Sequence, residues 1–342
     1  MISWVELISE VKEGPITPAG FITESTVFDP ELLKRDYHIN ATVRNLDKVE
    51  DIKNALSALS LDVNKIQFFQ ADLLSDDNWE DAMADCEYVM HVASPYPLNQ
   101  PKDENVLIKP AVEGTERVVS LAIKNNVKKI VLTSSVAAIS SGHTKKTYSE
   151  EDWSLVDKPI PTYPKSKALA EMKAWDLIKN SGSNTVLSVI NPAGVIGPSL
   201  TSEISSTQLI IAGLMNGRIP VNLPVHIGYV DVRDVALAHI SALESPKADG
   251  HRIILSNKEL WQKEVSVILR EGGFKAPKTS FSIPVAKLLS YFVPALKPAR
   301  KFLGKAMVKD SSKAEDLLGI KYRDVSESIL EVAKSLTEFN RV

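Results

Sequence analysis

Between about residue 38 and residue 192, short β-rich runs alternate with helical stretches, and this alternation restricts the chain to very few folds. The β-rich runs, such as "IQFFQAD" and "KKIVLTSS", are apolar almost throughout rather than at every second position. Strands of that kind are buried on both faces, as in parallel sheets that helices cover from both sides. The pattern therefore predicts an α/β fold with a Rossmann-like, doubly wound parallel sheet, whose ligands bind at the carboxyl ends of the strands.

The alternation loosens after Pro192, where "GPSLTSEISSTQ" reads as a loop and "HIGYVDVRDVALAHISAL" as a strand followed by a helix. We therefore predict a ligand-binding Rossmann-like domain over residues 1–192 with about 228–245. A smaller C-terminal substrate-binding lobe is predicted over about 193–227 and 246–342.

The composition excludes several classes of protein. A net charge of −3 gives no electrostatic reason to expect nucleic acid as a partner. The single cysteine, Cys86, cannot form an intrachain disulfide, which suits a reducing compartment. The N-terminus has three acidic residues and no basic n-region of a secretory signal. We expect a cytoplasmic protein with no metal site and no membrane partner.

The most apolar run, "SIPVAKLLSYFVPAL", is shorter than a membrane span and is interrupted by Lys287 and two prolines. This run predicts a buried helix of the small lobe rather than a membrane anchor.

The strand "KKIVLTSS" ends in Ser134 and Ser135, and "TYPKSK" follows with Tyr163 and Lys167 four residues apart. On a helix this spacing places the phenol and the ammonium group on one face. The positive charge favours the phenolate and is expected to lower the pKa of the tyrosine. Such a tyrosine can exchange a proton with a carbonyl or an alcohol, and a nearby serine hydroxyl can hydrogen-bond the same oxygen.

Eight segments together resemble the extended short-chain dehydrogenases/reductases, in the branch of dihydroflavonol reductase-like proteins. From about residue 41 to residue 239 they are, in family order, "ATVRN", "QADL", "HVASP", "KPAVEGT", "VLTSS", "YPKSKALAEMKAW", "NPAGVIGP" and "GYVDVRDVALAH". The resemblance implies that Ser135 binds the carbonyl, Tyr163 is the general acid/base and Lys167 binds the nicotinamide ribose. For Ser134 we expect a satisfied strand-end hydroxyl, and for Trp175 and Glu171 helix packing and a solvated face.

The residues after the second predicted strand, "INATV", favour NADP(H) over NAD(H). Enzymes that prefer NAD place an acid near this point, whereas Arg44 and Lys48 are cations that suit a 2′-phosphate, with Asp47 between them. By resemblance, Asp72 receives the adenine amino group. The other residues that the resemblance assigns to the cofactor are Leu73, Ala93, Ser94, Tyr163, Lys167, Pro192, Val195 and Ser206.

The phosphate loop departs from this family. Thr17 and Thr23 stand where the first and third glycines belong, and only Gly20 remains. The preceding "SEVKEGP" lacks the apolar run of a buried strand, and Asp29–Pro30 is a helix-start signal within the expected first helix. Either the cofactor site is degraded, or residues 1–30 differ from the natural product. We expect the backbone N–H groups of Gly20, Phe21 and Ile22 to bind the pyrophosphate.

Three functions are compatible with these residues. The first is an NADP-dependent oxidoreductase that reduces an aldehyde or ketone, or oxidises the alcohol, as a monomer or homodimer. The second is a nucleotide-sugar epimerase or dehydratase, which requires tightly held NAD and therefore a good glycine loop. The third is a binding protein that has lost catalysis, supported only by the altered loop. Ser140 replaces the amide or acid that plant dihydroflavonol reductases use to hold flavonoid hydroxyls, so a flavonoid substrate is not expected.

Overall fold

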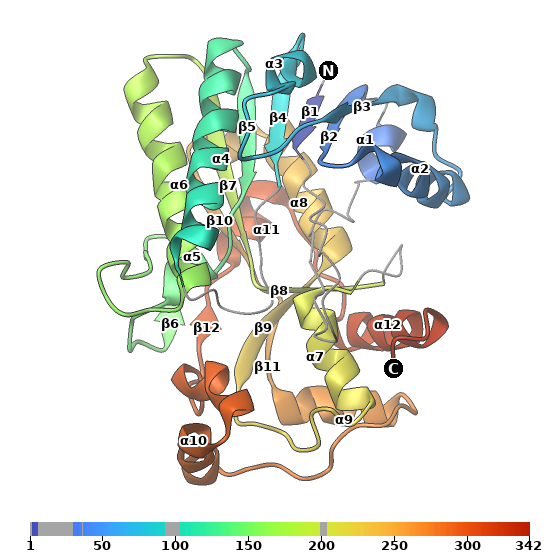
Figure 1. The fold of residues 1–342 in the computed structure, drawn as a ribbon, viewed down its shortest axis with the longest axis vertical. Helices are drawn as coiled ribbons and strands as arrows, with labels where there is room; N and C mark the ends of the chain where they lie inside the picture. The colour runs from blue at the N-terminus through green and yellow to red at the C-terminus, as the bar shows by residue number, and fades with distance from the viewer. Residues whose placement is uncertain (1, 6–29, 36, 93–102, 199–203) are drawn as a thin grey trace.

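A computed structural model describes residues 2–5, 30–35, 37–92, 103–198 and 204–342 (Figure 1). Its main element is a seven-stranded sheet in the order β10-β7-β5-β4-β1-β2-β3, in which every neighbouring pair is parallel. The strand order reverses between β1 and β4, which is the switch point of a doubly wound sheet. The predicted fold class is confirmed. The strands are β1 (Ile2–Val5), β2 (Ile39–Val43), β3 (Ile66–Gln70), β4 (Tyr88–His91), β5 (Lys129–Thr133), β7 (Val186–Pro192) and β10 (Arg252–Leu255).

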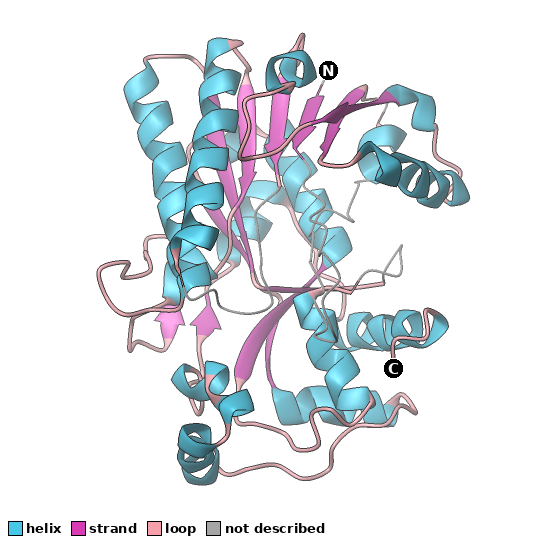
Figure 2. Cartoon of the chain, viewed as in Figure 1, coloured by secondary structure: helices cyan, strands magenta, loops and turns pink. Residues whose placement is uncertain are grey.

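Helices cover both faces of this sheet (Figure 2). One face packs against α1 (Pro30–Lys34), α2 (Val49–Ala58), α8 (Val232–Glu244) and α11 (Ser312–Leu318). The other packs against α3 (Trp79–Met83), α4 (Asn105–Lys124) and α6 (Thr162–Ser181). Two apolar cores result, which explains why the central strands carry apolar side chains at consecutive positions.

The first strand lies earlier in the chain than the sequence suggested. β1 is Ile2–Val5, and it pairs in parallel with β2 on one side and β4 on the other. The segment "SEVKEGP", in which the sequence shows no apolar run of a buried strand, follows β1 and lies outside the described residues. The start signal at Asp29–Pro30 is confirmed, because α1 begins at Pro30. Residues 6–29, with Thr17, Gly20 and Thr23, lie outside the described residues.

The C-terminal lobe has its own small sheet, in the order β11-β9-β8, and its own apolar core. Its strands are β8 (Gly194–Ile196), β9 (His226–Asp231) and β11 (Lys258–Trp261), and its helices include α7 (Ser206–Met215), α9 (Gln262–Glu271) and α12 (Val325–Glu338). The predicted division into two domains differs from this topology at two strands. β9 belongs to the small sheet, whereas β10 pairs with β7 at the edge of the main sheet.

One lobe helix is placed differently from its prediction. The run "SIPVAKLLSYFVPAL" does form a helix, α10 (Ile283–Phe292), followed by two short 3-10 turns, η5 (Pro294–Leu296) and η6 (Pro298–Lys301). However, α10 buries only the small residues Ala286 and Ser290, so the expectation of a buried helix is wrong. Among the described residues, no helix is both long and apolar enough to cross a membrane.

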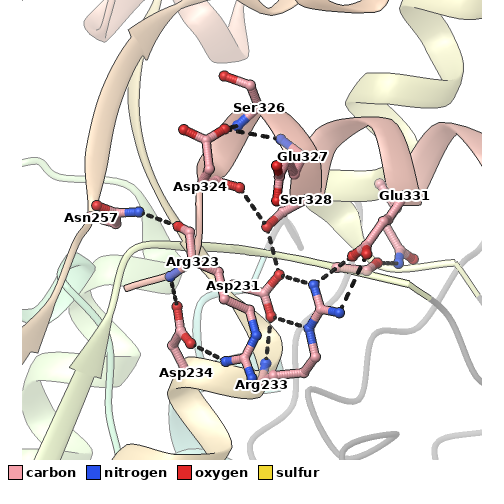
Figure 3. Close-up of polar contacts among 12 residues, drawn as sticks. Asp231, Arg233, Asp234, Asn257, Arg323, Asp324, Ser326, Glu327, Ser328 and Glu331 are labelled. Atoms are coloured by element: carbon pink, nitrogen blue, oxygen red, sulfur yellow. Dashed lines mark hydrogen bonds and ion pairs between the residues drawn. The ribbon is translucent and has the colours of Figure 1, made fainter. Parts of the chain in front are cut away.

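A polar network joins the lobe to the main domain (Figure 3). Asp231 ends β9, caps α8 and accepts hydrogen bonds from Arg233 and from the hydroxyl of Ser328 on α12. Burial by itself raises the pKa of the Asp231 carboxyl, but the hydrogen bonds from Arg233 and Ser328 outweigh it, so this pKa is lowered. Arg233 also donates to Glu331 of α12. The carboxylate of Asp231 therefore holds α8, which packs on the main sheet, against the lobe.

Candidate active site

The carboxyl ends of four main-sheet strands carry residues that the sequence assigned to catalysis or to the cofactor. Arg44 follows β2, Asp72 lies just beyond β3, Ser135 lies just beyond β5 and Pro192 ends β7. These strands are parallel neighbours of one sheet, so their carboxyl ends meet at one edge. This edge is where doubly wound folds bind their ligands.

The first half of α6 brings the predicted Tyr–Lys pair to the same edge. Lys167 is buried, with 5% of its surface exposed, and its Nζ donates to the backbone carbonyl of Thr133 at 3.3 Å. Tyr163 lies one turn earlier on the same face of the helix and is partly exposed. Since Thr133 is two residues before Ser135, the lysine is joined to the segment that carries the predicted catalytic serine.

Ser135 is held by two hydrogen bonds in a partly exposed position. Its Oγ accepts from the backbone N–H of Ala137 at 3.1 Å, and its carbonyl accepts from the side-chain amide of Asn191 at 3.3 Å. The hydroxyl hydrogen is still available for donation, since Oγ only accepts in this contact. Ser135 can therefore donate to a carbonyl oxygen placed beside it.

The sequence reasoning missed a buried ionic network behind this serine. Glu171, expected on a solvated face, is buried, and that expectation is wrong. Its carboxylate accepts from Arg252 Nε at 2.5 Å, from the Ser134 hydroxyl at 2.5 Å and from Asn191 Nδ2 at 2.9 Å. The expectation of a satisfied hydroxyl at Ser134 is confirmed, as is helix packing for Trp175. The contact between Glu171 of α6 and Arg252 of β10 joins residues far apart in the chain, so only the tertiary structure reveals it.

Arg252, the partner of Glu171, is itself firmly held. Its Nη1 donates to the carbonyl oxygens of Glu150 and Asp152, both at 2.6 Å, and its guanidinium lies 3.6 Å from the ring centroid of Trp153. The buried charge pair thus has the additional hydrogen bonds that a buried ion pair requires. It connects β10, α6 and the loop after β6 (Thr147–Tyr148).

Two buried histidines lie beneath the site. His239 of α8 faces the hydroxyl of Thr133 through Nε2 at 2.6 Å and the carbonyl of Val235 through Nδ1 at 2.8 Å. Because the carbonyl can only accept, Nδ1 carries the proton and Nε2 accepts from Thr133. Burial lowers the pKa of His239 to about 4. Burial and the charge of Lys167 lower the pKa of His91, at the end of β4, to about 3.

The residues predicted to bind the adenosine end of the cofactor lie beside one another after β2 and β3. Arg44 and Lys48 are partly buried, and Gln70 Nε2 donates to the Arg44 carbonyl at 3.0 Å. Asp72 uses Oδ1 to accept from its own turn, at Leu74 N–H, which leaves Oδ2 for an adenine amino group. The cations Arg44 and Lys48 follow β2, and the carboxylate of Asp72 follows the neighbouring β3, so these groups have the chemistry that an adenosine with a 2′-phosphate requires.

Of the other residues assigned to the cofactor, some lie in described parts of the chain and others do not. The side chain of Leu73 is buried against Gly114, so any contact with a cofactor falls to its backbone. Val195 lies in β8 and Ser206 is the first residue of α7. Gly20, Phe21, Ile22, Ala93 and Ser94 lie outside the described residues. In the part of the chain that the structure describes, no group of three or more His, Cys, Asp or Glu residues is arranged to hold a metal ion.

Curated relatives cover nearly the whole chain. Cinnamoyl-CoA reductase 2 of Arabidopsis thaliana is 33% identical, over 90% of this chain and 87% of its own length. The NADPH-dependent methylglyoxal reductase of Saccharomyces cerevisiae is 28% identical, over 94% of this chain and 96% of its own.

Solved structures of similar reductases have the same fold as this chain. Gre2 from Candida albicans in complex with NADPH superimposes with a TM-score of 0.75 at 26% identity, covering 99% of both chains. Vestitone reductase from alfalfa, at 21% identity, gives 0.71 and supports the fold alone. The sequence profile of the 3-beta hydroxysteroid dehydrogenase/isomerase family matches residues 16–264. The chain therefore belongs to the 3-beta hydroxysteroid dehydrogenase/isomerase family, within the extended short-chain dehydrogenases/reductases.

Proposed function

We propose that this protein is an NADPH-dependent reductase of an aldehyde or ketone, able to oxidise the corresponding alcohol in reverse. The observation that carries the proposal is the contact from Lys167 Nζ to the Thr133 carbonyl, which joins the Tyr163–Lys167 face of α6 to the strand end that bears Ser135. The similarity to cinnamoyl-CoA reductase and methylglyoxal reductase supports the reaction class.

Each member of the trio has a distinct part. The Ser135 hydroxyl donates a hydrogen bond to the carbonyl oxygen and holds it near the phenol. Tyr163 gives its phenolic proton to that oxygen as negative charge develops there. Lys167 stabilises the phenolate that remains, because an adjacent positive charge favours the ionised form. The chemistry supplied by the nicotinamide cofactor, when bound, is delivery of a hydride to the carbonyl carbon.

The proposed cofactor is NADPH rather than NADH. Arg44 and Lys48 follow β2, where an acidic residue would otherwise accept from the ribose 2′-hydroxyl. Asp72 is the proposed acceptor for the adenine amino group. Pro192 and Val195 are proposed to line the cofactor, together with Ala93 and Ser94, and Ser206 is proposed to contact a phosphate. Gly20, Phe21 and Ile22 remain the proposed pyrophosphate-binding backbone.

The proposed substrate is a moderately apolar carbonyl compound, bound between the nicotinamide and the C-terminal lobe. Ser140 supports the exclusion of flavonoids, because its hydroxyl donates to the Val136 carbonyl at 3.1 Å within the α5 turn (Ala137–Ser140). The hydroxyl keeps its acceptor lone pairs, but it is buried and neutral, so it does not replace the carboxylate or amide that holds the hydroxyl groups of a flavonoid.

The test is the rate of NADPH oxidation with a panel of aldehydes and ketones, for the parent chain and for Tyr163→Phe. We expect kcat to fall by roughly 10²–10⁴ in the variant, the usual contribution of a positioned acid/base group. Tyr88→Phe is the matched control. Tyr88 is the first residue of β4, whereas the candidate site lies at the carboxyl ends of the strands. A Tyr163→Phe variant as active as the parent would refute the proposed mechanism. Stoichiometric NAD that remains bound through purification would favour the epimerase class instead.

A further inference from the structure

The helix α10 is oriented with its large apolar side chains toward solvent. Val285, Leu288, Tyr291 and Phe292 are 43%, 62%, 65% and 74% exposed, whereas Ala286 and Ser290 are buried. Leu288, Tyr291 and Phe292 are three and four residues apart, so they form one continuous face. We call Val285, Leu288, Tyr291 and Phe292 the α10 surface. Figure 1 shows this helix at the end of the lobe farthest from the main sheet.

Single exposed apolar residues are ordinary, but a continuous apolar helix face is not. In the folded lobe, the small side chains of Ala286 and Ser290 pack inward, and the four large side chains of the α10 surface remain exposed. An apolar face of this kind indicates a binding surface, and the charges around it indicate the kind of partner that binds there.

The segment around α10 is strongly basic. Residues 272–309 contain eight Lys or Arg and no Asp or Glu. Since the whole chain has a net charge of −3, the rest of it carries −11 when these eight charges are set aside. Seven of the eight cations are exposed, namely Lys275, Lys278, Lys287, Lys297, Arg300, Lys301 and Lys305. The guanidinium of Arg300 lies 4.8 Å from the ring centroid of Tyr291, so charge and apolar surface are in direct contact.

We propose that the α10 surface docks on an anionic phospholipid bilayer, with α10 lying in the plane of the interface. Such a bilayer offers hydrocarbon directly beneath a layer of negative charge. Leu288, Tyr291 and Phe292 enter the headgroup–acyl boundary, while the surrounding lysines remain at the phosphate level. This departs from the expectation of no membrane partner, which rested on the absence of a spanning run. A helix of ten residues is too short to span but long enough to lie on the surface.

A second copy of this chain fits the α10 surface poorly. Two copies that met face to face through α10 would bring two sets of exposed cations together, with no acidic residue of residues 272–309 to offset them. A bilayer that contains anionic lipid removes this repulsion. The proposed docking also bears on the active site, because Lys301 Nζ donates at 2.6 Å to the carbonyl of Pro159, in the loop that leads into α6 and Tyr163.

The experiment is co-sedimentation of the full chain with vesicles of phosphatidylcholine alone, or of phosphatidylcholine mixed with phosphatidylserine. We expect binding to the mixed vesicles, little binding to phosphatidylcholine alone, and a loss of binding as salt is raised. The double variant Leu288→Ser/Phe292→Ser should weaken binding by roughly tenfold or more, because it removes the side chains that enter the bilayer. The matched control, Leu74→Ser/Val106→Ser, changes two exposed apolar residues elsewhere and should bind like the parent.

A second pair of variants tests the charge. Lys297→Glu/Lys305→Glu should abolish the preference for phosphatidylserine, whereas Lys179→Glu/Lys247→Glu, at exposed positions outside the segment, should preserve it. Circular dichroism of each variant verifies folding. Failure of the folded parent to bind mixed vesicles would overturn the proposal, as would equal loss in the control variants. A concentration-dependent dimer that Leu288→Ser/Phe292→Ser dissociates, without vesicle binding, would identify a second copy as the occupant and also overturn it.

Discussion

Among single residues, Arg44 is the proposed determinant of cofactor choice. Charge-assisted hydrogen bonds from an arginine to a phosphate contribute about 1.5–3 kcal/mol, which corresponds to roughly tenfold to a hundredfold in affinity. We therefore expect Arg44→Gln to raise the KM for NADPH by about that factor and to change the KM for NADH much less. Steady-state kinetics with both cofactors measures this, with Lys53→Gln on α2 as the control. Equal losses for the two cofactors would show that Arg44 does not read the 2′-phosphate.

Glu171 is the second residue for which we expect an effect on the candidate site, as a positioning residue rather than a catalytic one. Glu171→Gln keeps the shape of the side chain but leaves the buried Arg252 without its counter-charge. Removal of one partner of a buried ion pair costs about 3–5 kcal/mol. We expect a decrease of about 3 kcal/mol in the free energy of unfolding, measured with urea, and a lower kcat.

The controls for Glu171 separate burial from charge. Glu116→Gln removes one partner of a partly exposed pair with Lys173 and should cost less than about 1 kcal/mol. The double variant Glu171→Gln/Arg252→Met should regain much of the stability, since it leaves no uncompensated charge. A double variant as unstable as Glu171→Gln alone would mean that the hydrogen bonds, not the charge pair, stabilise this region.

At the scale of elements, α6 organises the site because one of its faces carries Tyr163, Lys167 and Glu171 at successive intervals of four residues. The three side chains meet different partners along the length of the helix. Tyr163 is partly exposed, Lys167 reaches the end of β5, and Glu171 reaches β10. A shift of α6 along its axis would therefore displace Tyr163, the proposed proton donor, and the ionic network together.

The helix α7 depends on its N-terminal cap, a capping box in which the Ser205 hydroxyl accepts from Gln208 N–H at 3.2 Å and Gln208 Oε1 accepts from Ser205 N–H at 2.8 Å. Loss of a serine cap costs about 1 kcal/mol. We expect Ser205→Ala to lower the free energy of unfolding by about that amount in urea titrations, and to weaken NADPH binding if Ser206 contacts a phosphate. Ser57→Ala, at an exposed position of α2, is the control. An unchanged unfolding midpoint would show that the cap does not stabilise α7.

At the scale of the whole molecule, the buried histidines make stability depend on pH. The pKa of His239 falls from 6.5 to about 4 on folding, so the unfolded chain binds a proton in this window that the folded chain does not. Stability is therefore fully present above pH 6.5 and decreases as the pH falls toward 4, by up to about 1.4 kcal/mol per pH unit for each such group. His91 contributes in the same direction, down to about pH 3.

The measurement is the free energy of unfolding at several pH values between neutrality and the acid limit of solubility. His239→Gln retains a side chain that can accept from Thr133 but does not titrate. We expect its free energy of unfolding to decrease less steeply below pH 6.5 than that of the parent. The difference between the two slopes should correspond to the binding of about one proton. His251→Gln, at an exposed position, should keep the slope of the parent. Identical slopes for His239→Gln and the parent would contradict the assignment of a neutral buried histidine.

The fold class follows from local sequence patterns, because strands that are apolar almost throughout are typical of a parallel sheet covered on both faces. The sequence by itself also located Ser135, Tyr163 and Lys167, since a strand end and a four-residue helical spacing are local features. The tertiary structure alone decided that β1 is Ile2–Val5, that β10 joins the main sheet and that Glu171 is buried. It also decided that α10 turns its apolar face outward. These facts depend on which segments pack together, and an amphipathic or charged pattern specifies a face without specifying what covers it.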